Sequence, residues 1–129
     1  MDVKLKLDAQ AMQAVSDALM YSAADAVEEL HTEVLSAKVM PFDTGDMQNN
    51  QTFVVSERAE SANIIRATLV TGSPQARRLY YHPEYHFQHA NNPNAGGQWL
   101  EPWLTGAHKD FLPGAFAEFL RIRLNKLKG

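Results

Sequence analysis

The sequence predicts a single α+β domain over residues 1–129, built around one long amphipathic helix. A stretch of about 30 residues contains no glycine or proline and repeats apolar side chains at three- and four-residue steps, which is the helical period. Two short runs of strand-like composition follow it, and a second stretch with helical periodicity ends the chain. No linker, repeat or low-complexity tract divides these elements, and 129 residues is an ordinary size for one domain.

The long helix is expected from Ala9 to about Lys38. Asp8 can accept a hydrogen bond from an unpaired backbone N–H at its start, and Pro41 marks its end. A helix of about 30 residues spans roughly 45 Å, so it is expected to reach beyond its own core. Its apolar stripe consists of Met12, Val15, Leu19, Ala23, Ala26, Val27, Leu30 and Val34.

Three short strands are expected around this helix. Apolar residues alternate with lysines from Val3 to Leu7, which is the period of a half-buried strand. The segments Gln51–Glu57 and Asn63–Thr71 have strand composition and are separated by the polar, turn-like segment Arg58–Ala62. These two segments are therefore predicted to pair as a hairpin.

The C-terminal half is predicted to contain two helical segments separated by a long loop. Gln75–Tyr81 can form a helical turn, and Glu84–Gln98 is irregular and rich in asparagine, glycine and proline. A loop of this length in a small domain is usually functional or mobile. Trp103–Lys128 has helical periodicity, and Pro113 within it implies either a helix that starts there or a kink.

Composition and charge exclude several classes of function. The net charge is -3 and there is no basic footprint of the kind that nucleic-acid binders carry, so direct nucleic-acid binding is not expected. The chain has no cysteine, which removes disulfides, thiolate metal sites and cysteine nucleophiles. Neither a signal peptide nor a membrane span is predicted, so the protein is expected in the cytoplasm of the cell that makes it.

Three histidines and a glutamate form the densest polar cluster of the sequence. They are His82, Glu84, His86 and His89. Imidazole groups bind zinc and related ions, so a small metal-dependent hydrolase that uses the three histidines is the alternative function. The spacing differs from the helical His-Glu-x-x-His arrangement, and Pro83 prevents an uninterrupted helix here. A solvated polar loop is the preferred interpretation, and no metal or cofactor is expected.

Asp43 and Asp46 flank Gly45 and form the other candidate acidic pair. A carboxylate pair needs a metal or a perturbed neighbour before it supports hydrolysis, and a turn explains these residues without one. The phosphate-binding Gly-x-x-x-x-Gly-Lys-Ser pattern and the nucleophile pattern Gly-x-Ser-x-Gly are both absent from the sequence. The sequence therefore predicts a protein that is not an enzyme, with no catalytic residues.

Aromatic side chains gather in one stretch beside the predicted loop. They are Tyr80, Tyr81, Tyr85, Phe87, Trp99 and Trp103, and Arg77 and Arg78 precede them. Tyrosine, tryptophan and arginine are enriched at the positions where protein interfaces gain most of their affinity. This region is the candidate partner-binding surface. The rings can instead cover the small sheet and hold the loop in place, and both interpretations can be true.

Four short motifs follow one another along the chain. A Pro-x-Asp-Thr-Gly turn occupies positions 41–45, and Ala-Arg-Arg-Leu-Tyr-Tyr follows the predicted hairpin at 76–81. Asn-Pro-Asn-Ala stands at 92–95 and Trp-x-Glu-Pro-Trp at 99–103, ahead of the terminal helix. This order resembles the minor capsid proteins of long-tailed bacteriophages and prophages, which are similar in turn to tail-completion, or head–tail joining, proteins.

The resemblance implies a structural role in the virion without catalysis. Relatives of this kind form a ring at the junction of head and tail, with contacts to the portal side and the tail-tube side. The implied fold is a long N-terminal helix packed on a small antiparallel β-sheet, with a second, C-terminal helix. The implied partners are other virion proteins and further copies of the chain in a homo-oligomeric ring, with no direct nucleic acid and no membrane.

The residues expected to contact these partners lie in the turn and in the segment that carries the aromatic residues and arginines. A stiff core displays loops, and the loops make the contacts. The candidate contact residues are Asp43, Thr44, Gly45, Arg77, Arg78, Tyr80, Tyr81, Asn94, Trp99 and Trp103. The protein is expected in the host cytoplasm during assembly and then in the virion.

Overall fold

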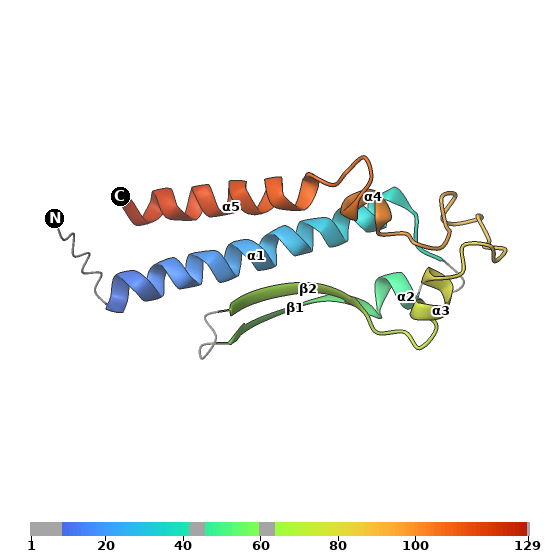
Figure 1. Ribbon diagram of the computed structural model, residues 1–129, viewed down its shortest axis with the longest axis horizontal. Coiled ribbons are helices and arrows are strands. Elements are labelled where there is room, and N and C mark those ends of the chain that lie inside the picture. Colours follow the sequence, from blue (N-terminus) through green and yellow to red (C-terminus); the bar gives the residue numbers. More distant parts are fainter. Residues whose placement is uncertain (1–8, 42–45, 60–63, 129) are drawn as a thin grey trace.

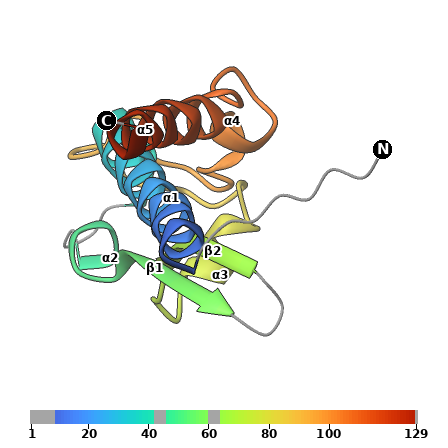
Figure 2. The ribbon, with the colours of Figure 1, turned by 90° about the vertical axis from the view of Figure 1, so that its left-hand side faces the viewer.

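Helix α1 (Ala9–Ala37) runs through the centre of the structure, between a β-hairpin on one side and helix α5 (Phe111–Lys128) on the other (Figure 1). The computed structural model describes residues 9–41, 46–59 and 64–128. The hairpin consists of β1 (Thr52–Ala59) and β2 (Ile64–Thr71), and the short helices are α2 (Asp46–Asn49), α3 (Ala76–Tyr80) and α4 (Glu101–Leu104). This arrangement confirms the predicted α+β class. Viewed along α1, the hairpin and α5 lie on opposite sides of that helix (Figure 2).

The end of α1 differs slightly from the prediction. The helix begins at Ala9, as predicted, but its last residue is Ala37 rather than Lys38. Lys38 has a φ of 55°, a left-handed conformation that ends the helical hydrogen-bond pattern, and its amide donates to the Leu35 carbonyl at 3.2 Å. Glycine is the usual residue in that conformation, so a lysine there gives no stop signal in the sequence.

Part of the sequence interpretation falls outside the described residues. This applies to the strand predicted at Val3–Leu7, to the helix cap predicted at Asp8 and to positions 42–45 of the predicted turn. Immediately after that turn, α2 forms a single helical turn at Asp46–Asn49, which the sequence does not predict.

The hairpin extends further than predicted. Its strands pair antiparallel, starting with Thr52 opposite Thr71. The predicted polar turn at Arg58–Ala62 is wrong at its start, because Arg58 continues β1. The guanidinium of Arg58 donates to the Asp17 carboxylate of α1 at 2.7 Å, so a residue that looks like part of a solvated turn is instead packed against the helix.

The hairpin presents one face to α1 and leaves the other to solvent. Thr52, Val54 and Leu69 are buried or half-buried on the inner face, whereas Phe53 and Val55 are exposed on the outer face. Successive side chains of a strand point to opposite faces, so this alternation follows directly from the strand geometry. The outer face therefore leaves the apolar Phe53 and Val55 exposed beside the ion pair between Arg66 and Glu57.

The predicted helical stretch Trp103–Lys128 is wrong as a single element. The structure has α4 and α5 there, separated by residues 105–110. Pro113 lies in the first turn of α5, so of its two interpretations the start of a helix is confirmed. Gly106 allows the close turn between the helices, because an added Cβ at Gly106 would lie 2.8 Å from the Cα of Pro102.

The main core lies at the C-terminal half of α1. Large apolar side chains from that helix meet side chains from α3, α4 and the loops. Burial of this apolar surface contributes roughly 25 cal/mol per Å² to stability, which makes this end the best-stabilised part of the fold. The buried cluster consists of Leu30, Val34, Met40, Ala76, Trp99 and Trp103.

The N-terminal half of α1 packs through small residues. Ala18, Ser22 and Ala26 are buried one helical turn apart, which lets neighbouring elements approach closely. Met12 and Val15 of the predicted apolar stripe are 56% and 42% exposed, so the buried face of α1 does not extend to them. The physical reason is that the helix turns its small-residue face, rather than these larger side chains, toward its neighbours.

Two arginines join α1 to the elements on either side of it. Besides the pair between Arg58 and Asp17, Arg123 of α5 donates to the Asp25 carboxylate at 2.6 Å and to the Ser22 hydroxyl at 3.4 Å. The hydrogen bond from Arg58 lowers the pKa of the Asp17 carboxyl below its ordinary value. These contacts fix the register of β1 and α5 along the same helix.

We expect Leu30→Asp to unfold the domain, whereas Val15→Asp leaves it folded. Leu30 is buried, so an aspartate there places an unpaired charge in the core and lowers the free energy of unfolding by more than about 3 kcal/mol. Val15 lies on the same helix but is exposed, so its substitution changes stability by about 0.5 kcal/mol or less. Urea denaturation followed by circular dichroism measures both values. Equal destabilisation of the two variants would contradict the burial described here.

Candidate partner-binding site

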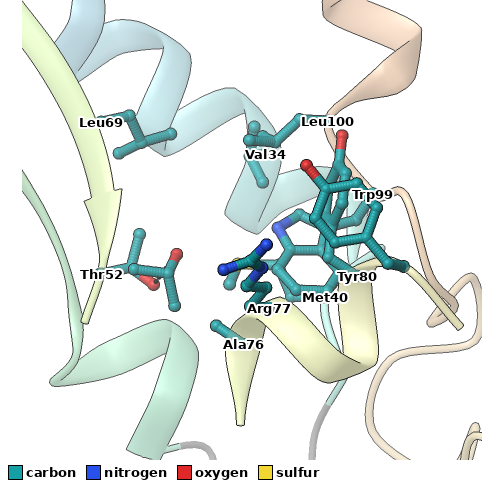
Figure 3. A pocket seen from close by; sticks show the side chains of 11 residues that line it. Val34, Met40, Thr52, Leu69, Ala76, Arg77, Tyr80, Trp99 and Leu100 are labelled. Atoms are coloured by element: carbon teal, nitrogen blue, oxygen red, sulfur yellow. Dashed lines mark hydrogen bonds between the residues drawn. The ribbon is translucent and has the colours of Figure 1, made fainter. Parts of the chain in front are cut away.

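A pocket of about 480 Å³ opens beside α3, where the C-terminal half of α1 meets one end of the hairpin (Figure 3). Ligand-binding pockets usually measure roughly 300–1,000 Å³. The lining residues come from α1, both strands, α3 and two loops, so only the folded chain forms the site. They are Val34, Met40, Thr52, Leu69, Thr71, Ala76, Arg77, Tyr80, Tyr81, Trp99 and Leu100.

The floor of the pocket is apolar and closely packed. Val34 and Met40 are each 1% exposed, and Trp99 is 5% exposed. Leu69 and Leu100 stand at the sides of the cavity (Figure 3). Because the aliphatic side chains of the floor offer water no hydrogen bonds, an apolar group that replaces water there is stabilised by the hydrophobic effect.

The loop that follows α3 holds this floor in place by binding the end of α1. The Asn92 side chain donates to the Met40 carbonyl at 2.8 Å, and the Asn94 side chain donates to the Ala37 carbonyl at 3.0 Å. The last carbonyls of a helix have no partner within the helix, and Ala37 is the last residue of α1, so Asn94 supplies a donor that the helix lacks. Asn92 instead supplies a donor to the carbonyl of the buried Met40, three residues beyond the helix. The predicted Glu84–Gln98 loop is irregular, as expected, and its second half has this structural role.

Arg77 gives the pocket its charge. Figure 3 shows the guanidinium directed into the cavity from α3. None of the described residues that line the pocket is acidic, and no ion pair of Arg77 occurs within residues 9–41, 46–59 and 64–128. The site therefore combines an uncompensated positive charge with an apolar floor.

The two threonines of the pocket use their protons inside the protein. Thr52 Oγ1 lies 2.7 Å from the Met47 carbonyl oxygen and 3.1 Å from Thr71 Oγ1. A carbonyl can only accept, so the Thr52 hydroxyl donates to it and the Thr71 hydroxyl donates to Thr52. These hydroxyl groups can therefore offer a ligand lone pairs but no protons.

Tyr80 connects α3 to the segment that carries the two tryptophans. Its phenol donates to Glu101 Oε1 at 3.1 Å, and its ring meets the Trp99 ring edge to face at 4.8 Å. Burial, together with the neighbouring Glu101 carboxylate, raises the pKa of Tyr80 to about 12. The phenol therefore keeps its proton, and the bond that positions this wall of the pocket persists at neutral pH.

Four predicted contact residues come together in the pocket. Arg77, Tyr80, Tyr81 and Trp99 all line it, although Trp99 is separated from the others by a loop. Tyr81 is 64% exposed at the rim. Aromatic and arginine composition thus selected four residues that the fold brings to one pocket.

The other predicted contact residues lie elsewhere. Arg78 is exposed on α3 but does not line the pocket. Asn94 lies in the loop before α4 and binds the carbonyl of Ala37, the last residue of α1. Trp103 is buried in the core, where it supports the site but presents little surface to a partner. Asp43, Thr44 and Gly45 lie outside the described residues.

Sequence reasoning missed the floor and the strand side of the pocket. Val34 and Leu69 are ordinary apolar positions of a helix and a strand, and no local signal distinguishes them from the rest of the core. Thr52 and Thr71 are opposite each other at the open end of the hairpin. Correct pairing of the two strands from the sequence would have placed them together.

The histidines of the predicted cluster do not converge. His82 Nδ1 lies 2.7 Å from Glu84 Oε1, whereas His89 Nε2 lies 3.0 Å from the Ala95 carbonyl oxygen and His86 is exposed. Over the described parts of the chain, no three histidine, aspartate or glutamate side chains form a group that could hold a metal ion. A metal-dependent hydrolase requires such convergence, so no observation favours that alternative.

A smaller hollow of about 300 Å³ lies between α1, β2 and α5. Its lining is apolar, and without a polar side chain to orient a ligand it gives no basis for specific recognition. The residues that line it are Ala23, Ala26, Val27, Ala67, Leu112, Pro113 and Phe116.

No family model, curated protein or solved structure matches this chain. None of the helices in the described parts of the chain combines the length and the apolar character needed to cross a membrane.

We expect Asn92→Ala to destabilise the fold more than Asn94→Ala. Asn92 is buried, and its loss leaves the Met40 carbonyl without this donor, at a cost of about 1–3 kcal/mol. Asn94 is exposed, so water can replace its bond to Ala37. Chemical denaturation of both variants measures the difference. An equal effect of the two substitutions would show that the loop does not hold the helix end in the way described.

The contribution of Tyr80 to stability is expected to decrease at high pH. The folded protein holds the Tyr80 proton up to a pKa of about 12, compared with an ordinary value of 10.0, so the unfolded chain loses it first. The stabilisation is complete below pH 10 and is lost as the pH rises from 10 to 12. Urea unfolding of the natural chain and of Tyr80→Phe should therefore give a stability difference that shrinks across this range. A constant difference would contradict the raised pKa.

Proposed function

We propose that this chain is a non-enzymatic structural subunit of a bacteriophage particle, a head–tail connector or tail-completion subunit that joins head and tail through protein–protein contacts. The sequence resemblance to minor capsid proteins supports this role. Two of the four motifs that carry it pack against each other, since Ala76 shares the core with Trp99 and Trp103 and the Tyr80 ring meets the Trp99 ring. A third motif, at 92–95, binds the chain at and just after the end of α1.

The observation that carries the proposal is the amount of large apolar surface left uncovered. Exposed side chains of this kind occur on α1, on α5, on the outer face of the hairpin and around α3 and α4. An isolated exposed apolar residue is normal, whereas contiguous apolar patches mark interaction surfaces. The residues are Met12, Val15, Tyr21, Phe53, Val55, Ile64, Tyr81, Tyr85, Leu104, Ile122 and Leu127.

The shape of the fold suits a subunit with several neighbours. α1 spans about 43 Å if its 29 residues rise 1.5 Å each, and the exposed apolar groups are distributed along that length. A contact between unlike patches on adjacent copies can close into a ring, in which each copy is held on two sides. Such a ring offers one face to the head and the other to the tail.

A catalytic role receives no comparable support. Among the described residues that line the pocket there is no histidine, aspartate, glutamate or lysine to act as a general base. The threonine hydroxyls that could act as nucleophiles are hydrogen-bonded to each other and to Met47 rather than to a base. The pocket thus has the chemistry of a binding surface.

Particles made with and without this chain provide the direct test. We expect the protein to be a component of purified virions by mass spectrometry, and deletion of its gene to give separate heads and tails in electron micrographs. Complementation with the natural gene should restore joined particles. Normal joined particles from the deletion, or absence of the protein from virions, would overturn the proposal.

The double substitution Arg77→Ala with Tyr81→Ala should leave the fold intact and impair assembly. Both side chains lie at the exposed rim of the pocket, so the change in the free energy of unfolding stays small. Infectious titre measures assembly, and circular dichroism measures folding. The matched control is Lys109→Ala, an exposed cation between α4 and α5 that does not line the pocket. A normal titre from the double variant would count against this surface as the interface.

A further inference from the structure

We propose that the pocket recognises an acidic apolar segment of a partner protein. A large apolar side chain of the partner enters the cavity and rests on Val34, Met40 and Trp99, while a carboxylate on the neighbouring residue pairs with Arg77. This inference rests on the proposed function, because it specifies the chemistry of the partner that the same surface contacts.

The apolar half of this ligand follows from the floor of the pocket. Val34, Met40 and Trp99 are almost completely buried, yet they border a cavity of about 480 Å³ that opens to solvent. The cavity is large enough for one aromatic or aliphatic side chain with its neighbouring backbone. Tyr80 and Trp99 already meet edge to face, so an entering ring can extend the same packing.

The negatively charged half of this ligand follows from the hydrogen-bond donors that the pocket walls offer. The hydroxyl protons of Thr52 and Thr71 are used within the protein, and the Tyr80 phenol donates to Glu101. Arg77 therefore supplies most of the donors that the described lining offers, with five N–H groups in a planar fork. That fork matches the two oxygens of a carboxylate, and the apolar walls strengthen the pairing.

The charge distribution argues against two other occupants. A cationic group would meet the guanidinium of Arg77 with no carboxylate among the described lining residues to compensate it. A nucleic-acid backbone requires a row of cations, whereas α3 provides Arg77 and Arg78 on a chain of net charge -3. A ligand with one carboxylate beside one apolar side chain can pair with Arg77 and also pack on the apolar floor of the pocket.

The two parts of the site are arranged so that a partner can reach them. Arg77 and Tyr81 are exposed at the rim, whereas the apolar floor lies beneath them. The centre of a protein interface is typically an anchor side chain in a pocket surrounded by polar contacts at its edge. The pocket has this layout, with room for one anchor side chain of the partner.

Three blocked peptides test the proposal on the full chain. The first contains Phe-Glu between glycine and serine residues, the second has Gln in place of Glu, and the third has Ser in place of Phe. The protein has two tryptophans, so the two indole N–H signals in a ¹H–¹⁵N spectrum report the result. Trp99 lines the pocket and reports binding, whereas Trp103 lies in the core and reports folding.

We expect the Phe-Glu peptide to shift the Trp99 signal and to saturate. The Phe-Gln peptide should bind about tenfold more weakly, because a hydrogen bond to a charged group contributes about that much to affinity. The Ser-Glu peptide should not bind measurably, since it leaves the apolar floor exposed to water. Equal affinity for the first two peptides, or no shift of Trp99 with any of them, would overturn the proposal.

Arg77→Gln should remove the preference for glutamate over glutamine. The matched variant Arg66→Gln removes the same charge from the outer face of the hairpin and should keep the tenfold preference. An unchanged Trp103 signal shows that each variant is folded. If Arg77→Gln keeps the preference, or Arg66→Gln loses it, direct pairing with Arg77 is wrong. Tighter binding of a DNA duplex that displaces the peptide would identify a nucleic-acid site instead.

The pocket and the proposed function can fail separately. Selective binding of the Phe-Glu peptide by a chain that is absent from virions would leave the pocket assignment intact and overturn the role in the particle. A chain that is required to join head and tail but does not discriminate between the peptides would retain that role and overturn the partner chemistry.

Discussion

The carbonyl groups at the end of α1 impose a constraint on which the rest of the structure depends. A helix leaves its last carbonyls without internal partners, and here the segment that follows α1 leads within three residues to the buried Met40. The loop 92–96 supplies the missing donors through bonds to Ala37, Lys38, Val39 and Met40. These bonds join segments more than 50 residues apart, and they bring Trp99 and α3 against the helix. The pocket exists because of this connection.

The two ends of the molecule have different physical characters. At the C-terminal half of α1, large side chains are buried and a pocket remains among them. At the N-terminal half, small residues and the ion pairs of Arg58 and Arg123 hold the hairpin and α5, while Met12 and Val15 stay exposed. One end of the molecule therefore combines large buried side chains with a pocket, whereas the other end leaves larger apolar side chains at the surface.

The accuracy of sequence-based prediction varied with the kind of signal. Periodicity placed α1 to within one residue at its C-terminal end and located both strands, because local patterns determine which face of an element is apolar. It failed at Arg58, whose polar side chain is held by Asp17 of a distant helix, and in the region after Trp103, where Gly106 permits a turn between two helices. The first failure depends on a contact between residues 41 positions apart in the sequence, whereas the second depends on a local backbone turn that helical periodicity does not reveal.

The sequence by itself determined the α+β class, the long helix, the hairpin and the aromatic and arginine-rich character of the site. Those features depend on composition and spacing within short segments. Only the tertiary structure decided that Arg77, Tyr80, Tyr81 and Trp99 share a pocket with Val34 and Met40, that Asn92 and Asn94 bind the end of α1, and that Met12 is exposed. The physical reason is that a local pattern specifies which side of an element avoids water, whereas the partner that covers that side is chosen by long-range packing and by the need to satisfy buried hydrogen-bonding groups.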